Sequence, residues 1–172
     1  MEYLLDITTL ITLISDICHD SEIDTRFGSI NEWKSKNESI YNSIVDEKNN
    51  PVFPKLTKIL DDNKLYATRL AWDKFNGIIN LYGSNKEKER LTKLKINLVD
   101  DDVPIEFQNL TGKLWSNENK STFGLASKNN YTLVTGNVSA LSNALDLDSE
   151  LKYVGHRSRC FVGKKYEIQM VN

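Results

Sequence analysis

The start of the chain joins a short apolar run to a helical pattern, with one carboxylate between them. Tyr3-Leu4-Leu5 is followed directly by Asp6. The apolar residues beyond Asp6 recur every three or four positions, which predicts a helix that runs through Ile17 and is capped by Thr8 or Thr9. Asp6 would then lie at the carboxyl end of a buried strand, which is where open α/β sheets bind ligands.

Strand and helix patterns alternate along the rest of the sequence. We predict helix fragments and loop over residues 104–120, and a further strand within residues 161–171. The alternation predicts a mostly parallel central sheet with helices on both faces, in one domain over residues 1–172. The other predicted strands are 3–5, 64–68, 95–99, 131–135 and 151–154, and the other predicted helices are 29–50, 54–60, 71–82, 86–94 and 138–145.

Composition narrows the classes of function. The formal net charge of −2 argues against a generally basic nucleic-acid-binding surface. No stretch approaches the roughly 20 apolar residues that span a bilayer, and the N-terminus lacks the pattern of a secretory signal. With only 2 cysteines, we expect reduced thiols in a protein of the cytoplasm or nucleus. We also expect that the protein binds no membrane and no small-molecule cofactor.

Several segments together resemble one family. Leu5-Asp-Ile-Thr-Thr-Leu-Ile11 resembles the first strand of PIN-like domains, and is most similar to the PIN-like part of the domain of unknown function 1308 (DUF1308) family, which includes the UPF0415 proteins. Further similar segments follow in the order of that family: Asp73-Lys-Phe75 with Ile78-Ile79, Gly83 with Glu87–Leu94, Leu98-Val99-Asp100, Phe123-Gly124, Thr135-Gly-Asn137, and His156 with Arg159.

The resemblance implies a PIN-like, three-layer α/β/α fold. PIN nucleases gather several carboxylates at the carboxyl edge of the sheet, where these residues bind Mg²⁺ or Mn²⁺. Hard divalent cations require such oxygen ligands, and they activate water and stabilise the charge that builds on the phosphate.

At the positions of these carboxylates the sequence departs from the nuclease pattern. Asp6 occupies the first acid position, but the helix acid falls at Arg69, the next at Ser127 and the last at Asn137. One carboxylate with a cation nearby holds Mg²⁺ poorly. The resemblance therefore implies a degenerate acidic site, with Asp6 as a weak metal ligand and no bound cofactor.

Two other interpretations of the acidic residues stay open. Asp6 and Asp73, with Asp100 as a further candidate, could form the site of a working Mg²⁺- or Mn²⁺-dependent ribonuclease, if the helix acid aligns at Asp73 instead of Arg69. Alternatively, Asp6 only caps the following helix, and Asp100-Asp101-Asp102 only form a turn before Pro104.

Basic residues suggest where nucleic acid would bind. Arg pairs well with phosphate, although a charged edge that only faces solvent is the favoured interpretation. The candidates for contact with nucleic acid are Arg69, Lys128, His156, Arg157 and Arg159.

Three hypotheses about function follow. The first is a catalytically degenerate PIN-like domain that binds RNA or protein, the second is the ribonuclease above, and the third is a structural domain whose helix over Trp33–Ile44 docks a partner. A zinc site from Cys18, His19, His156 and Cys160 has no recognised spacing. The sequence leaves the oligomeric state open.

Overall fold

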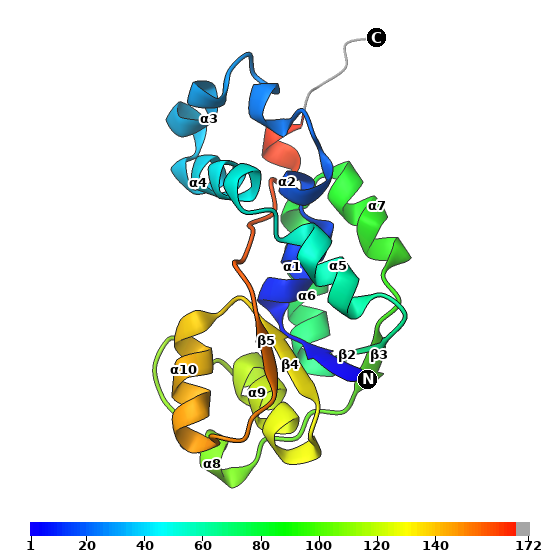
Figure 1. Ribbon diagram of the computed structural model, residues 1–172, viewed down its shortest axis with the longest axis vertical. Helices are drawn as coiled ribbons and strands as arrows, with labels where there is room; N and C mark the ends of the chain where they lie inside the picture. The colour runs from blue at the N-terminus through cyan, green and yellow to red at the C-terminus, as the bar shows by residue number, and fades with distance from the viewer. Residues whose placement is uncertain (168–172) are drawn as a thin grey trace.

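Five parallel strands form a single sheet in the order β3-β2-β1-β4-β5. In the computed structural model, which describes residues 1–167, the sheet lies between layers of helices (Figure 1). The strands are β1 (Glu2–Leu5), β2 (Lys64–Thr68), β3 (Asn97–Val99), β4 (Thr132–Thr135) and β5 (Tyr153–Gly155). The all-parallel arrangement confirms the predicted three-layer α/β/α fold.

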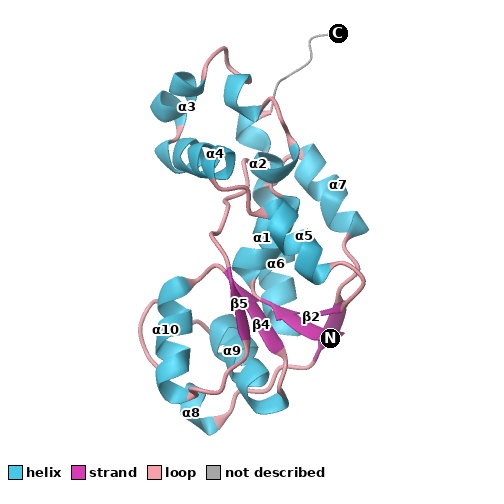
Figure 2. Ribbon diagram, viewed as in Figure 1, coloured by secondary structure: helices cyan, strands magenta, loops and turns pink. Residues whose placement is uncertain are grey.

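The helices fall mainly on the two faces of this sheet, as Figure 2 shows. They are α1 (Ile7–Ile14), α2 (Asp16–His19), α3 (Ile30–Lys36), α4 (Glu38–Asn49), α5 (Phe53–Leu60), α6 (Arg69–Tyr82), α7 (Asn85–Lys93), α8 (Ile105–Gln108), α9 (Asn117–Asn129) and α10 (Val138–Leu147), with 3₁₀ turns η1 (Ile23–Thr25) and η2 (Lys164–Tyr166). None of those within residues 1–167 is long and apolar enough to cross a bilayer.

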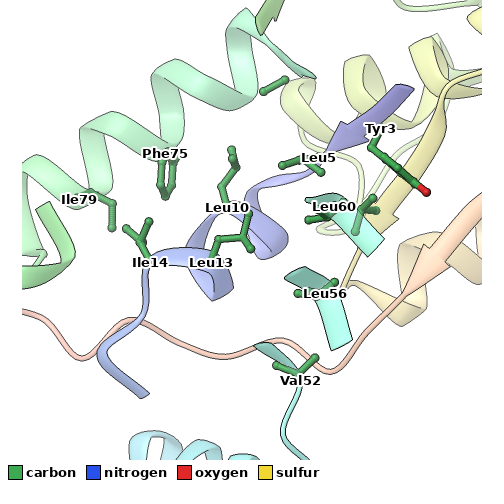
Figure 3. Close-up of a cluster of buried hydrophobic side chains, with 12 residues drawn as sticks. Tyr3, Leu5, Leu10, Leu13, Ile14, Val52, Leu56, Leu60, Phe75 and Ile79 are labelled. Atoms are coloured by element: carbon green, nitrogen blue, oxygen red, sulfur yellow. The ribbon is translucent and has the colours of Figure 1, made fainter. Parts of the chain in front are cut away.

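Alternate residues of β1 supply the two hydrophobic cores, because successive side chains of a strand point to opposite faces. Tyr3 and Leu5 pack with α1, α5 and α6 in one cluster, and Figure 3 shows Leu10 and Phe75 facing each other within it. Leu4 packs on the other face with α9 and α10. The sheet is therefore buried on both sides around β1.

A third cluster belongs to a helical unit made of α2, η1, α3 and α4. Trp33 is fully buried there, and its indole N–H donates to the carbonyl of Ile23 at 2.6 Å. The predicted single helix over residues 29–50 is wrong, because Asn37 ends α3 and caps α4 by accepting from the amide of Ile40. Trp33, Ile40 and Ile44 face the interior, which argues against a docking helix over Trp33–Ile44.

Other boundaries also differ from the sequence prediction. Asp6 caps α1, in place of Thr8 or Thr9. Helix α9 extends well beyond the fragments predicted over residues 104–120. Of the predicted strand at residues 161–171, residues 161–167 form no strand and contain the turn η2, and residues 168–171 lie outside the described part.

Candidate active site

Asp6 lies at the point where the strand order reverses. Strands β1 and β4 are neighbours, but the chain leaves β1 for α1 and reaches β2 on the other side first. The carboxyl ends of two such strands leave a crevice, which is the common ligand site of open α/β sheets. Asp6 follows β1 at this crevice, and Thr135 ends β4 beside it. The fold thus puts Asp6 where the sequence predicted it.

The carboxylate of Asp6 is turned inward and is only 2% exposed. Its Oδ1 accepts from the Thr9 amide at 2.9 Å and from the Thr8 hydroxyl at 2.7 Å. Its Oδ2 accepts from the Thr135 hydroxyl. Hydrogen bonds of this kind satisfy the oxygens of a buried carboxylate, and they use the electron pairs that a metal ion would need.

The direction of the two hydroxyl bonds is fixed by the backbone. The Thr8 hydroxyl oxygen accepts from the Gly136 amide at 2.8 Å, and that of Thr135 accepts from the Asn137 amide at 2.9 Å. An amide can only donate, so each hydroxyl directs its own proton to Asp6. Asp6 is therefore an acceptor that joins the loops after β1 and β4.

His156 contacts the start of α1 beside the crevice. Its Nε2 lies 2.8 Å from the Thr9 hydroxyl oxygen, and its Nδ1 lies 3.0 Å from the carbonyl of Arg157, to which it can only donate. Burial lowers the pKa of His156, which favours the neutral ring. A Cβ added to Gly136 would lie 2.9 Å from the His156 ring and 2.8 Å from Ser158, so glycine permits this close approach.

The segment that follows β5 continues along one face of α1. Thr12 accepts from the amide of Arg159 at 3.0 Å, and Ser15 donates to the carbonyl of Cys160 at 2.5 Å. Thr9, Thr12 and Ser15 are spaced by three residues and so share a helix face. Their hydroxyls are all buried. Segment 156–160, which we call the strap, is thus fixed over the carboxyl edge of the sheet.

The other acidic candidates do not gather around Asp6. Asp73 is exposed on α6, and Asp100 pairs with Arg69 at 2.8 Å with a side chain that is 91% exposed. Asp101 accepts from the hydroxyl of Ser121 at 2.6 Å. Within residues 1–167, no group of three or more acidic, His or Cys side chains is placed to hold a metal ion.

The positions predicted to have lost their acids are not all at this edge. Arg69 starts α6 and Asn137 caps α10, so both follow strand ends. Ser127, however, lies near the end of α9 and donates to Asp148 at 2.6 Å. Asp148 ends α10, just before β5 begins. The placement of Ser127 in the acidic site is therefore corrected, because α9 carries it toward the opposite edge of the sheet.

The basic candidates are paired with carboxylates. Arg69 binds Asp100, Lys128 binds Asp102 at 2.6 Å, and Arg157 binds Asp46 at 2.8 Å. These pairs reduce the positive charge available to phosphate.

Arg159 is a structural residue. It is 2% exposed, and it donates to Glu47 at 2.7 Å and to Asp46 at 2.6 Å. A third bond goes to the carbonyl of Asn50 at 3.0 Å. These bonds attach the strap to α4 and argue against Arg159 as a nucleic-acid contact.

A second buried carboxylate, that of Glu87, was not predicted to be important by itself. Oε1 accepts from the amides of Ser84 and Gly163, and Oε2 from those of Asp16 and Val162, at 2.8–3.1 Å. The capping-box pattern Ser84-x-x-Glu87 was the signal that could have indicated it.

The thiols fit a structural role. Burial raises the pKa of Cys18 to about 12 and also raises the pKa of Cys160. Metal binding requires thiolates, which such an environment disfavours. His19 contacts the carbonyl of Leu13 at 2.8 Å, so its ring is also engaged within the fold.

Two comparisons relate the chain to known proteins. The model of the DUF1308 family, described as a protein of unknown function, matches residues 4–168, which confirms the resemblance found in the sequence. The chain is also similar to a chain in the crystal structure of VapBC2 from Rickettsia felis bound to a DNA fragment from their promoter. The identity is 13%, the TM-score is 0.42, and the match covers 90% of this chain and 98% of that chain.

Proposed function

The chain belongs to the DUF1308 family, and we propose that it is a catalytically degenerate PIN-like domain that acts by binding a protein partner. One observation carries this proposal: the single carboxylate at the switch point is buried and accepts from donors whose direction is fixed. Asp6 therefore stabilises the contact between the loops after β1 and β4.

Metal-dependent cleavage needs more than this site offers. A divalent cation loses part of its hydration shell on binding, and several anionic oxygens must compensate for that loss. Asp6 would first have to release its hydroxyl donors, and the strap would have to move. Arg69, at the start of the helix after β2, stands where an acidic ligand would be needed, and it is paired with Asp100.

A protein partner is favoured over RNA by the charges. Affinity for nucleic acid comes largely from cations that neutralise phosphates. Here Arg69, Lys128 and Arg157 each have a carboxylate partner within 4 Å, and the net charge of the chain is −2. Phosphate would have to compete with these carboxylates.

The test combines metal binding with cleavage. Mn²⁺ is titrated by calorimetry into the wild type, Asp6→Asn and Glu89→Gln, the last being an exposed control on α7. Each protein is also incubated with Mn²⁺ and a fluorescent single-stranded RNA. We expect no specific binding up to about 1 mM Mn²⁺, and no cleavage.

Micromolar Mn²⁺ binding that is lost in Asp6→Asn and kept in Glu89→Gln would overturn the proposal. Cleavage with the same dependence would establish the ribonuclease instead. The choice between partners is tested by anisotropy of the same RNA at low salt without metal. Saturable binding there would replace the protein partner with RNA.

A further inference from the structure

Strand β5 has a free edge. It pairs with β4 through the amide of Leu133, which donates to the Lys152 carbonyl, and the amide of His156, which donates to the Thr135 carbonyl. In this parallel register the backbone N–H and C=O groups of Tyr153 and Gly155 point away from β4. No residue in the range 1–167 forms a backbone or side-chain hydrogen bond with these groups, and β5 is the outermost strand on its side (Figure 2).

An apolar groove of about 410 Å³ lies beside this edge. It is formed by α5, β5 and the start of α10, and Val138 at that start is 71% exposed. Its apolar lining consists of Val52, Leu56, Ile59, Val138 and Val154. Unpaired peptide groups next to an apolar groove are the two elements by which a sheet binds an extended peptide.

The rim of the groove is positively charged. Lys55 and Arg157 line it, and none of the acidic residues within positions 1–167 does. Lys55 has no carboxylate within 4 Å in the described chain, whereas Arg157 pairs with Asp46. An acidic side chain placed next to Lys55 could therefore form an ion pair with its ammonium group.

We propose that an extended segment of a partner protein adds to β5 as a sixth strand. Alternate side chains of the segment enter the groove, and an Asp or Glu of the segment pairs with Lys55. The inference rests on the proposed function as a binding domain and assigns the surface that the domain uses. A second copy of the chain fits less well, because two such rims would bring Lys55 and Arg157 of each copy together.

The probe is a peptide selected from a displayed library of random dodecapeptides on the wild-type protein. We expect enriched sequences that alternate apolar and polar residues and carry an Asp or Glu. The affinity of the best synthetic peptide is then measured by calorimetry for two matched pairs of variants.

The first pair tests the backbone of the edge. Gly155→Pro removes one outward N–H, and edge strands tolerate proline. Gly155→Ala keeps this N–H, and its added Cβ would meet only Leu141 at 3.8 Å. We expect Gly155→Pro to weaken peptide binding about tenfold, through the lost hydrogen bond and the fit around it, and Gly155→Ala to bind like the wild type.

The second pair tests the charge. Lys55→Glu reverses the rim charge, and Lys58→Glu makes the same change at an exposed position of α5 outside the groove. We expect only Lys55→Glu to reduce the affinity, and by less at high salt. In hydrogen exchange, the amides of Tyr153 and Gly155 should become protected when the peptide binds.

The inference is overturned if the selection yields no peptide, or if the peptide binds both members of each pair equally. It is also overturned if sedimentation shows a dimer that Gly155→Pro dissolves, because the edge then binds a second copy. The Mn²⁺ titration is independent. Metal binding at Asp6 would reject the proposed function even if a peptide binds to β5. If no metal binds and the affinity of the peptide is the same for both members of each variant pair, only this inference is rejected.

Discussion

At the residue scale, the central feature is an internal anion supported by threonines. Asp6 receives its hydrogen bonds from the Thr9 amide and from the hydroxyls of Thr8 and Thr135. Both hydroxyls are themselves held by backbone amides of the loop after β4. Hydrogen bonds to a charged group are stronger than neutral ones, so Asp6 couples the first and fourth strands of the sequence at the crevice.

Replacing Asp6 by Asn should destabilise the fold. The amide nitrogen of Asn brings two donors to a position surrounded by donors, and one buried donor is left without a partner. We expect the free energy of unfolding in urea to fall by about 2–4 kcal/mol. Asp73→Asn, on the exposed face of α6, should change it by less than about 0.5 kcal/mol. Equal effects of the two substitutions would contradict the role given to Asp6.

His156 should make stability depend on pH. Burial lowers the pKa of His156 below its ordinary value, and it also lowers the pKa of His19. The unfolded chain then binds more protons than the folded chain as the pH falls through the unfolded value of about 6.5. Stability is therefore full above that pH and decreases below it.

The variant His156→Gln isolates this contribution. We expect the loss of unfolding free energy between about pH 7.5 and about pH 5.5 to be smaller in His156→Gln than in the wild type, with the remainder due to His19. Urea denaturation at several pH values provides the measurement. An unchanged pH dependence in the variant would rule out the neutral, buried ring.

The position of Asp6 at a strand end could be predicted from sequence, but its environment could not. The apolar run and the helical spacing that follows were sufficient to place the carboxylate at the crevice. Asp6 accepts from Thr135, and His156 contacts the neighbouring Thr9; both residues come from segments far along the chain. The spacing of Thr9, Thr12 and Ser15 on one helix face was a local signal for a polar contact, although it could not identify the strap.

At the element scale, Glu87 holds three parts of the chain together. Its carboxylate accepts backbone amides from the start of α7, the start of α2 and the segment before η2. The carboxylate of Asp16 adds a bond from the Ser84 hydroxyl at 2.9 Å and one from Arg90 at 2.7 Å. These bonds attach the helical unit to the start of α7.

The substitution Glu87→Gln should weaken this attachment. A Gln amide accepts through one oxygen, so two of the amides now bound to Glu87 face a donor. We expect the free energy of unfolding to decrease by about 2–4 kcal/mol. The matched control is Glu89→Gln, an exposed residue of the same helix that pairs with Lys93, and its effect should stay within about 0.5 kcal/mol. The account of α7 fails if Glu87→Gln is as stable as this control.

Element types were more predictable than element boundaries. Hydrophobic periodicity identified β1, β2, β4 and α6 well. It also joined α3 and α4 into one helix, because Trp33, Ile40 and Ile44 continue a single apolar stripe. The break depends on the Asn37 side chain as a cap, and a polar residue within a polar helix face gives little warning of this. Helix α9 was underestimated because its apolar residues are scattered among polar ones.

At the scale of the whole molecule, the features that resemble the family largely serve the architecture. Asp6, Glu87, His156 and Arg159 are all engaged with other parts of the chain, and three of them are almost fully buried. Charged residues at the carboxyl edge pair among themselves. The free edge of β5 and its groove, in contrast, combine unpaired backbone groups with an apolar lining and the unpaired Lys55 within residues 1–167.

The most direct test of the central claim is paramagnetic broadening of backbone amide signals by Mn²⁺ in the ¹⁵N-labelled protein. If Asp6 is an internal acceptor, the amides of Thr8, Thr9 and Gly136 should keep their intensities at Mn²⁺ concentrations up to about 1 mM. The exposed carboxylates of Asp73 and Asp100 report weak surface binding in the same spectra. Selective loss of the Thr8, Thr9 and Gly136 signals at micromolar Mn²⁺ would contradict the account and identify a functional metal site.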